Sequence, residues 1–104
     1  MKVKLDVGER MVVISILPKE GNFLTLRVLR TLVSRIGLTA EEIKEFEVVQ
    51  EGDRIVWNQK GYELLEFDLA DVELDMIKQE LKKLDSENKL TQDMFSIYEK
   101  FIIS

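Results

Sequence analysis

The chain of 104 residues contains no cysteine and no histidine. Without cysteine it can form no disulfide, no thiolate nucleophile and no cysteine-ligated metal site. Without histidine it also lacks the commonest general base and the commonest protein ligand for metals. The missing histidine weighs more against catalysis than the missing cysteine does. We therefore predict that the protein is not an enzyme and uses no cofactor.

Glycine and proline are scarce, and long hydrophobic runs are absent. The five glycines stand singly, so the chain has no glycine-rich loop that would bind a phosphate. The most apolar stretch, Met11–Leu17, is far too short to cross a membrane. Asp6 and Glu9 precede it and no small-residue cleavage site follows, which argues against a secretory signal. We expect a cytoplasmic protein whose chain is complete from its first residue.

Apolar residues make up 45% of the chain and are spread along its whole length. They suffice for one core but not for two, so residues 1–104 are expected to form a single domain. Charges are distributed less evenly. Residues 1–36 hold seven basic and three acidic side chains, whereas residues 37–104 hold eight basic and seventeen acidic ones. This pattern predicts a basic patch on an acidic body.

The first segment with regular periodicity, residues 7–17, is compatible with two structures. Its content of valine and isoleucine favours a strand that would pair with residues 2–7. Asp6 followed by Glu9 is instead typical of a capping box, and Pro18 would end the helix that this box starts. We favour the helix.

A second helix is predicted over residues 26–36, capped by Thr25 and ended by Gly37. The side chains expected to face the core are Leu26, Leu29, Val33 and Ile36. The spacing of Thr39 and Glu42 is again that of a capping box, and it predicts a short third helix to about residue 45.

After the third helix the apolar period changes to two, which is typical of strands. Residues 47–50 and 54–58 flank Glu51-Gly52-Asp53, a sequence typical of a tight hairpin turn. Residues 62–69 are predicted as a third strand, and Trp57 is expected to pack between this sheet and a helix.

Two helices are predicted at the C-terminal end. The first, residues 69–84, would start at Asp68 or Asp71. Its expected apolar stripe consists of Leu69, Val72, Met76, Ile77, Leu81 and Leu84. The last helix would be capped by Thr91. Its expected apolar face consists of Met94, Phe95, Tyr98, Phe101 and Ile102.

The predicted fold class is therefore α+β, with three N-terminal helices, a small antiparallel hairpin or sheet, and two C-terminal helices. Three helices followed by a hairpin also resemble a winged-helix domain, which makes a nucleic-acid-binding regulator the alternative hypothesis. In such a domain the third helix enters the major groove and needs positive charge. Here the third helix, residues 40–45, and the hairpin tip are both acidic, which disfavours DNA binding in the usual way.

The candidate interaction residues lie in two of the predicted helices. In the second helix Arg27 and Arg30 share a polar stripe with Arg35 close by, and they could bind phosphates or an acidic partner. The commoner arrangement is a solvated face whose arginines pair with acids of the same chain. In the last helix Tyr98 and Phe101 could form an exposed binding face, although packing on the core or on a second copy is the commoner role.

Acidic clusters could hold a divalent cation or catalyse glycoside hydrolysis, and Glu41 with Glu42 and Asp71 with Glu73 and Asp75 are the candidates. Twenty acids in 104 residues make such clusters frequent by chance. The last three have the spacing of a calcium loop but lack the glycine that would turn it. We therefore predict no catalytic and no metal-binding residue.

Several short stretches, taken in order, carry a resemblance to known proteins: Glu9-Arg10, residues 17–22, residues 41–46, Trp57-Asn58, residues 81–85, residues 89–91 and residues 98–101. In these stretches the chain resembles a group of small bacteriophage and prophage proteins of unassigned function. The resemblance implies a phage or prophage origin and brings no catalytic residue. Our first hypothesis is a non-enzymatic accessory protein that binds a host or phage protein, or a second copy of itself, and does not bind membranes.

Overall fold

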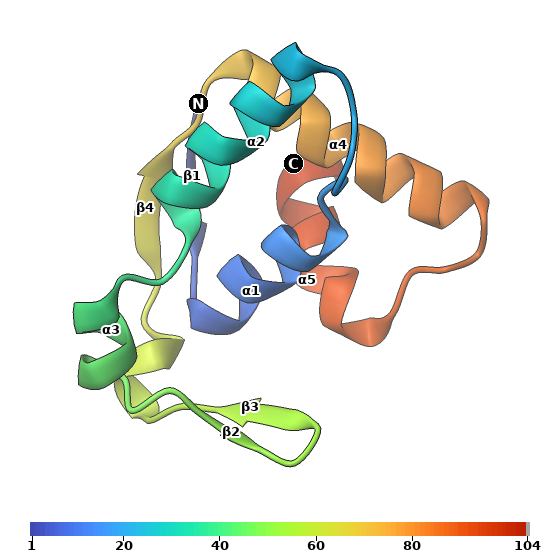
Figure 1. Ribbon diagram of the computed structural model, residues 1–104. Coiled ribbons are helices and arrows are strands. Elements are labelled where there is room, and N and C mark those ends of the chain that lie inside the picture. The colour runs from blue at the N-terminus through green and yellow to red at the C-terminus, as the bar shows by residue number, and fades with distance from the viewer. Residues whose placement is uncertain (104) are drawn as a thin grey trace.

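The computed structural model describes residues 1–103. Along the chain lie β1 (Lys2–Leu5), α1 (Val7–Ile16), α2 (Phe23–Ile36), α3 (Ala40–Glu45), β2 (Val49–Glu51), β3 (Arg54–Val56), η1 (Gln59–Tyr62), β4 (Leu65–Asp68), α4 (Asp71–Ser86), η2 (Gln92–Met94), α5 (Phe95–Tyr98) and η3 (Glu99–Ile103). Helices mixed with short antiparallel strands confirm the α+β class (Figure 1).

The strands form two separate antiparallel pairs. β2 and β3 form the predicted hairpin, and Gly52 in its turn has a φ of 62°, which glycine adopts without steric cost. β4 is a strand, as predicted for residues 62–69, but it does not extend the hairpin. It pairs with β1, with Lys2 opposite Asp68. The sequence pattern named no partner for this strand, and the partner lies at the other end of the chain.

Capping interactions fix the starts of α1 and α3. In α1 the Asp6 carboxylate accepts from the Glu9 N–H at 2.8 Å, and the Glu9 carboxylate accepts from the Asp6 N–H at 3.1 Å. This reciprocal box confirms the helix over the strand for residues 7–17. Thr39 and Glu42 form the same box at the start of α3, which ends at Glu45 as predicted.

Helix α2 starts earlier than predicted and turns a different face inward. Asn22 caps it, accepting from the Thr25 N–H at 2.8 Å, so Thr25 is not the cap. The buried side chains of α2 are Leu29, Leu32 and Ile36. Leu26 and Val33, which were expected in the core, are 44% and 40% exposed. Apolar side chains occupy more of the circumference of α2 than the core can cover, so only those that face the core are buried.

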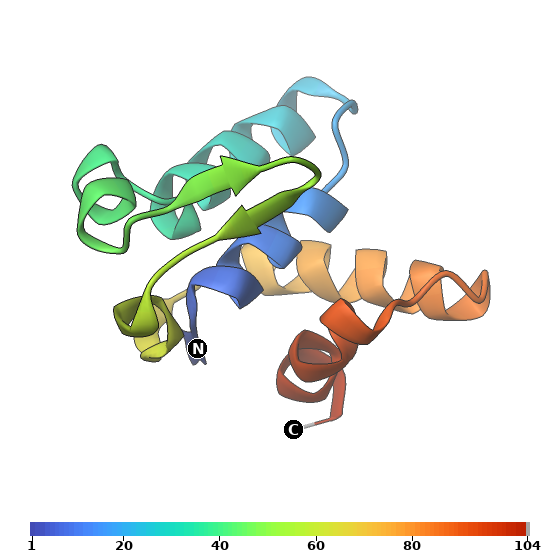
Figure 2. The same cartoon turned by 90° about the horizontal axis from the view of Figure 1, so that it is seen from below.

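The core lies between β1, α1, α2, α4 and the last helical segment (Figures 1 and 2). Both ends of the chain contribute to it, since Leu5 and Ile97 are each fully buried. Helix α4 begins at Asp71, the second of the two predicted starts, and Ala70 is its cap residue. Its buried face includes Leu74, Ile77 and Leu81, whereas Val72 of the predicted stripe is 53% exposed.

The last helix is one uninterrupted helical run, residues 92–103, whose hydrogen-bonding pattern changes twice along its length. It consists of the 3₁₀ turn η2, one α-helical turn α5 and the π-helical turn η3. Thr91 is the cap residue, as predicted, but its side chain makes no capping hydrogen bond. Ile97 and Phe101, four residues apart, face the core, so Phe95 lies outside and is 62% exposed.

Trp57 contacts helix α1 as expected, and it also contacts the 3₁₀ turn η1. A Cβ atom added to Gly8 of α1 would lie 3.1 Å from the indole ring, and one added to Gly61 of η1 would clash with it. The Tyr62 ring lies 5.7 Å from the indole, between ring centres. The indole is therefore held between two glycines that leave room for it.

Candidate functional site

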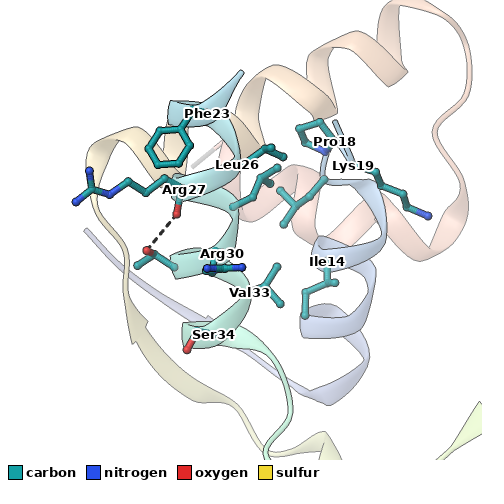
Figure 3. A pocket seen from close by; sticks show the side chains of 12 residues that line it. Ile14, Pro18, Lys19, Phe23, Leu26, Arg27, Arg30, Val33 and Ser34 are labelled. Carbon is teal, nitrogen blue, oxygen red and sulfur yellow. Dashed lines mark hydrogen bonds between the residues drawn. The ribbon is translucent and has the colours of Figure 1, made fainter. Parts of the chain in front are cut away.

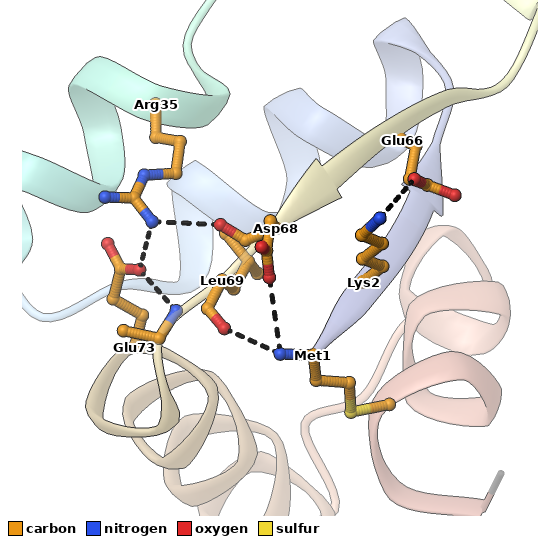
Figure 4. Close-up of polar contacts among 8 residues, drawn as sticks. Met1, Lys2, Arg35, Glu66, Asp68, Leu69 and Glu73 are labelled. Carbon is orange, nitrogen blue, oxygen red and sulfur yellow. Dashed lines mark hydrogen bonds and ion pairs between the residues drawn. The ribbon is translucent and has the colours of Figure 1, made fainter.

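Arg35, one of the candidate interaction residues, is engaged by the chain's own acceptors (Figure 4). Its guanidinium donates to the Glu73 carboxylate at 3.1 Å and to the Asp68 carbonyl at 2.9 Å. The same Glu73 oxygen accepts from the Ala70 N–H at 2.8 Å, and the Glu73 side chain is only 2% exposed. Arg35 therefore joins α2 to the start of α4, which is the structural alternative considered for the basic residues.

Arg10 forms a second ion pair, which was not predicted from the sequence. Its guanidinium donates to both Glu42 carboxylate oxygens at 2.8 Å and to the carbonyls of Ile36 and Gly37 at 2.8 and 2.9 Å. The hydrogen bonds from Arg10 are the main reason why the pKa of Glu42 is lowered to about 2. One signal could have revealed the pair. Arg10 falls on the apolar face of α1, where a buried cation requires a partner.

Lys100 forms a third ion pair, to Glu9 at 2.6 Å. The lysine also donates to the Lys4 carbonyl at 2.8 Å. Burial raises the pKa of Glu9, but hydrogen bonds from Lys100 and from the Asp6 N–H outweigh burial, so the pKa lies below its usual value. This pair attaches the last segment to the start of α1.

The acidic candidates do not form one cluster. Glu42 and Glu73 belong to two of the three ion pairs above, and Glu41, Asp71 and Asp75 are exposed. Within residues 1–103 no group of three or more acidic side chains is arranged to hold a metal ion.

Tyr98 and Phe101 lie on the inner side of the last segment. Phe101 is 2% exposed and packs in the core, so in this conformation its side chain does not reach a partner. The Tyr98 hydroxyl donates to Asp85 at 3.2 Å, and desolvation and the nearby carboxylate raise the Tyr98 pKa. Neither side chain forms the exposed face considered from the sequence.

Arg27 and Arg30 lie beside a groove between α1 and α2, which we call the α1–α2 groove (Figure 3). It is lined by Ile14, Leu17, Pro18, Lys19, Phe23, Leu26, Arg27, Leu29, Arg30, Thr31, Val33 and Ser34 and has a volume of about 1130 Å³. Its exposed apolar side chains include Leu26, Val33 and Phe23, the last of which is 75% exposed. Two of them, Leu26 and Val33, have the spacing of core residues but are exposed.

The charged side chains of the α1–α2 groove all have one sign. Its lining contains Lys19, Arg27 and Arg30 but no aspartate and no glutamate. Within residues 1–103 no ion pair joins these three cations to an acidic side chain. The chain carries a net charge of −5, so the rest of the protein is acidic and the groove is a local basic site.

The signal that could have indicated the groove is the surplus of apolar residues on the second predicted helix. Beside its buried side chains α2 carries Phe23, Leu24, Leu26 and Val33, all of which are exposed, and the first two precede the helix predicted from the sequence. A surface helix needs one apolar stripe, so a second one indicates a contact surface.

Comparison with protein-family models, with curated proteins and with solved structures gave no match. Within residues 1–103 no helix has the length and apolar character needed to cross a membrane.

Proposed function

We propose that the protein is a non-enzymatic binding protein that attaches to an acidic region of another protein through the α1–α2 groove. One observation carries the proposal: exposed apolar side chains and three unpaired cations share one groove on an acidic protein. Exposed apolar surface gains free energy when a partner covers it. The cations select partners by charge and speed their approach.

The resemblance to phage and prophage proteins supports an accessory role in the cytoplasm of a host cell. In that setting the partner is a host or phage protein. Arginine together with large apolar side chains is the composition enriched at the centres of protein interfaces, and Arg27, Leu26 and Phe23 supply it here.

Affinity capture with matched variants tests this function. Tagged wild-type protein, the double variant Arg27→Glu/Arg30→Glu and the control Lys60→Glu/Lys82→Glu are incubated with host lysate. Both pairs of side chains are exposed, and both variants change the net charge equally. We expect a partner to be retained by the wild type and the control and lost by the groove variant. Equal capture by all three proteins would place the binding site elsewhere, and repeated absence of any partner would refute the proposed function.

A nucleic-acid-binding regulator with a winged-helix-like arrangement is the second candidate, because Arg27 and Arg30 are also free to bind phosphates. The third helix works against it, since its exposed Glu41 and Glu45 would repel DNA. A gel-shift titration decides this case. Salt-sensitive binding that is lost in Arg27→Glu/Arg30→Glu would favour it, and no shift at low ionic strength would eliminate it.

A further inference from the structure

We infer that the element bound in the α1–α2 groove is an amphipathic α-helix with acidic residues on both sides of its apolar stripe. The inference rests on the proposed function and specifies the partner's chemistry.

The walls of the groove determine the secondary structure of the bound element. They consist of the end of α1, the loop after it, and α2 over Phe23–Ile36. Backbone groups inside these helices are already hydrogen-bonded to one another, and among residues 1–103 no strand edge borders the groove. An extended peptide would find few backbone partners there and would leave its own N–H and C=O groups unpaired. A helix satisfies these groups internally, so it can present side chains alone to the groove.

The apolar side chains determine the pattern of the bound helix. Figure 3 shows Leu26 and Val33 of α2 projecting toward Ile14 and Pro18, so that apolar atoms lie along the middle of the groove. Helix α2 has 14 residues, which corresponds to a length of about 21 Å. A helix of similar length would place apolar residues at positions i, i+4, i+7 and i+11 against this strip.

The cations determine the charge of the bound helix. In Figure 3 Arg27 and Lys19 lie on opposite sides of the apolar strip. Acidic residues on both flanks of a bound helix would therefore meet a cation on each side. A symmetric pairing of two copies through α2 would instead bring Arg27 and Arg30 of each copy toward those of the other. Repulsion between like charges makes a second copy the less favourable occupant.

A fluorescence-polarisation titration with a defined probe tests the inference. The probe is a fluorescein-labelled stapled helical peptide of about 14 residues with leucine at i, i+4, i+7 and i+11, glutamate on both flanks and alanine elsewhere, the staple compensating for the low stability of short isolated helices. Two matched peptides serve as controls, one with lysine in place of each glutamate and one with proline at its centre. The proteins are the wild type, Arg27→Glu/Arg30→Glu and Lys60→Glu/Lys82→Glu.

We expect the acidic helical peptide to bind the wild type and the Lys60/Lys82 variant equally, and the Arg27/Arg30 variant about ten-fold or more weakly. The proline peptide should bind weakly to all three proteins. The lysine peptide should bind the wild type and the Lys60/Lys82 variant weakly and the Arg27/Arg30 variant more tightly, because that variant presents two glutamates at the groove. If the proline peptide binds the wild type as tightly as the acidic helical peptide, the bound element is not a helix. If the lysine peptide binds the wild type as tightly, the bound element does not need acidic residues.

Two further outcomes would also overturn the inference. If the peptide fails to bind although lysate capture still depends on Arg27 and Arg30, the proposed function stands and only the helical occupant is wrong. If both experiments fail, the proposed function fails as well. Sedimentation velocity on the wild type and the Arg27/Arg30 variant provides the remaining check. Self-association that disappears in the variant would assign the groove to a second copy.

Discussion

Replacing Glu42 by glutamine should produce a large, pH-dependent loss of stability. The pKa of Glu42 is lowered from 4.5 to about 2 in the folded protein, which corresponds to about 3 kcal/mol of stability at neutral pH. Because the folded-state pKa is the lower one, this stability is fully present above about pH 5 and is lost as the pH falls toward 2. Glutamine keeps the shape of the side chain but has no charge, so it resembles protonated glutamate at every pH.

The source of the effect is a single buried cation. Arg10 is 2% exposed and Glu42 is 20% exposed, so the neutral variant leaves the guanidinium without its counter-ion in a buried position. The hydrogen bonds from Arg10 to Ile36 and Gly37 remain, which keeps the side chain in place. The measured loss therefore reports mainly the missing charge.

Urea denaturation between pH 7 and pH 2 measures the effect. We expect Glu42→Gln to be less stable than the wild type by about 3 kcal/mol at pH 7 and by less than about 1 kcal/mol at pH 2. Glu41→Gln is the matched control, because Glu41 lies in the same first turn but is exposed. It should lose only the helix-dipole contribution, about 0.3–1 kcal/mol. A Glu42→Gln loss that is the same at both pH values, or no larger than that of the control, would refute the reasoning.

Three further predictions follow from the packing. Lys100→Met should reduce stability by about 2 kcal/mol in urea denaturation at pH 7, since it leaves the buried Glu9 without its cation; an unchanged midpoint would show that the pair contributes nothing. Phe101→Ala should lower stability by about 3–5 kcal/mol in thermal unfolding, because Phe101 packs in the core; unchanged stability with lost partner capture would instead make it an interface residue. Gly61→Ala should push the ring of Trp57, the only tryptophan in the chain, toward water. Its fluorescence emission should then shift to longer wavelength, and an unshifted spectrum would contradict the clash.

The three ion pairs share one design. Glu9, Glu42 and Glu73 each occupy the third position of a helix and each accept a hydrogen bond from the backbone N–H of that helix's cap. Each carboxylate also accepts a hydrogen bond from a basic side chain of another element: Lys100, Arg10 and Arg35 respectively. A group that starts a helix locally therefore also fixes that helix within the fold.

The capping interactions, which lie within one helix turn, could be predicted from the sequence. The capping boxes at Asp6–Glu9 and Thr39–Glu42 place α1 and α3 correctly, and Gly52 places the hairpin turn. In each case the interacting groups are at most a few residues apart, so a short window of sequence contains both partners. The missing histidine and cysteine are likewise properties of the sequence alone, and they limit the chemistry whatever the fold.

The tertiary structure decided everything that depends on which distant segments meet. The pairing of Lys2 with Asp68 and of Arg10 with Glu42 joins groups that no local pattern connects. The same holds for exposure: Leu26 and Val33 have the spacing of core residues, but the core has room for only one face of α2. That face is Leu29, Leu32 and Ile36. The α1–α2 groove exists because burial is decided by the surface available on neighbouring elements, and the sequence of one helix does not contain that information.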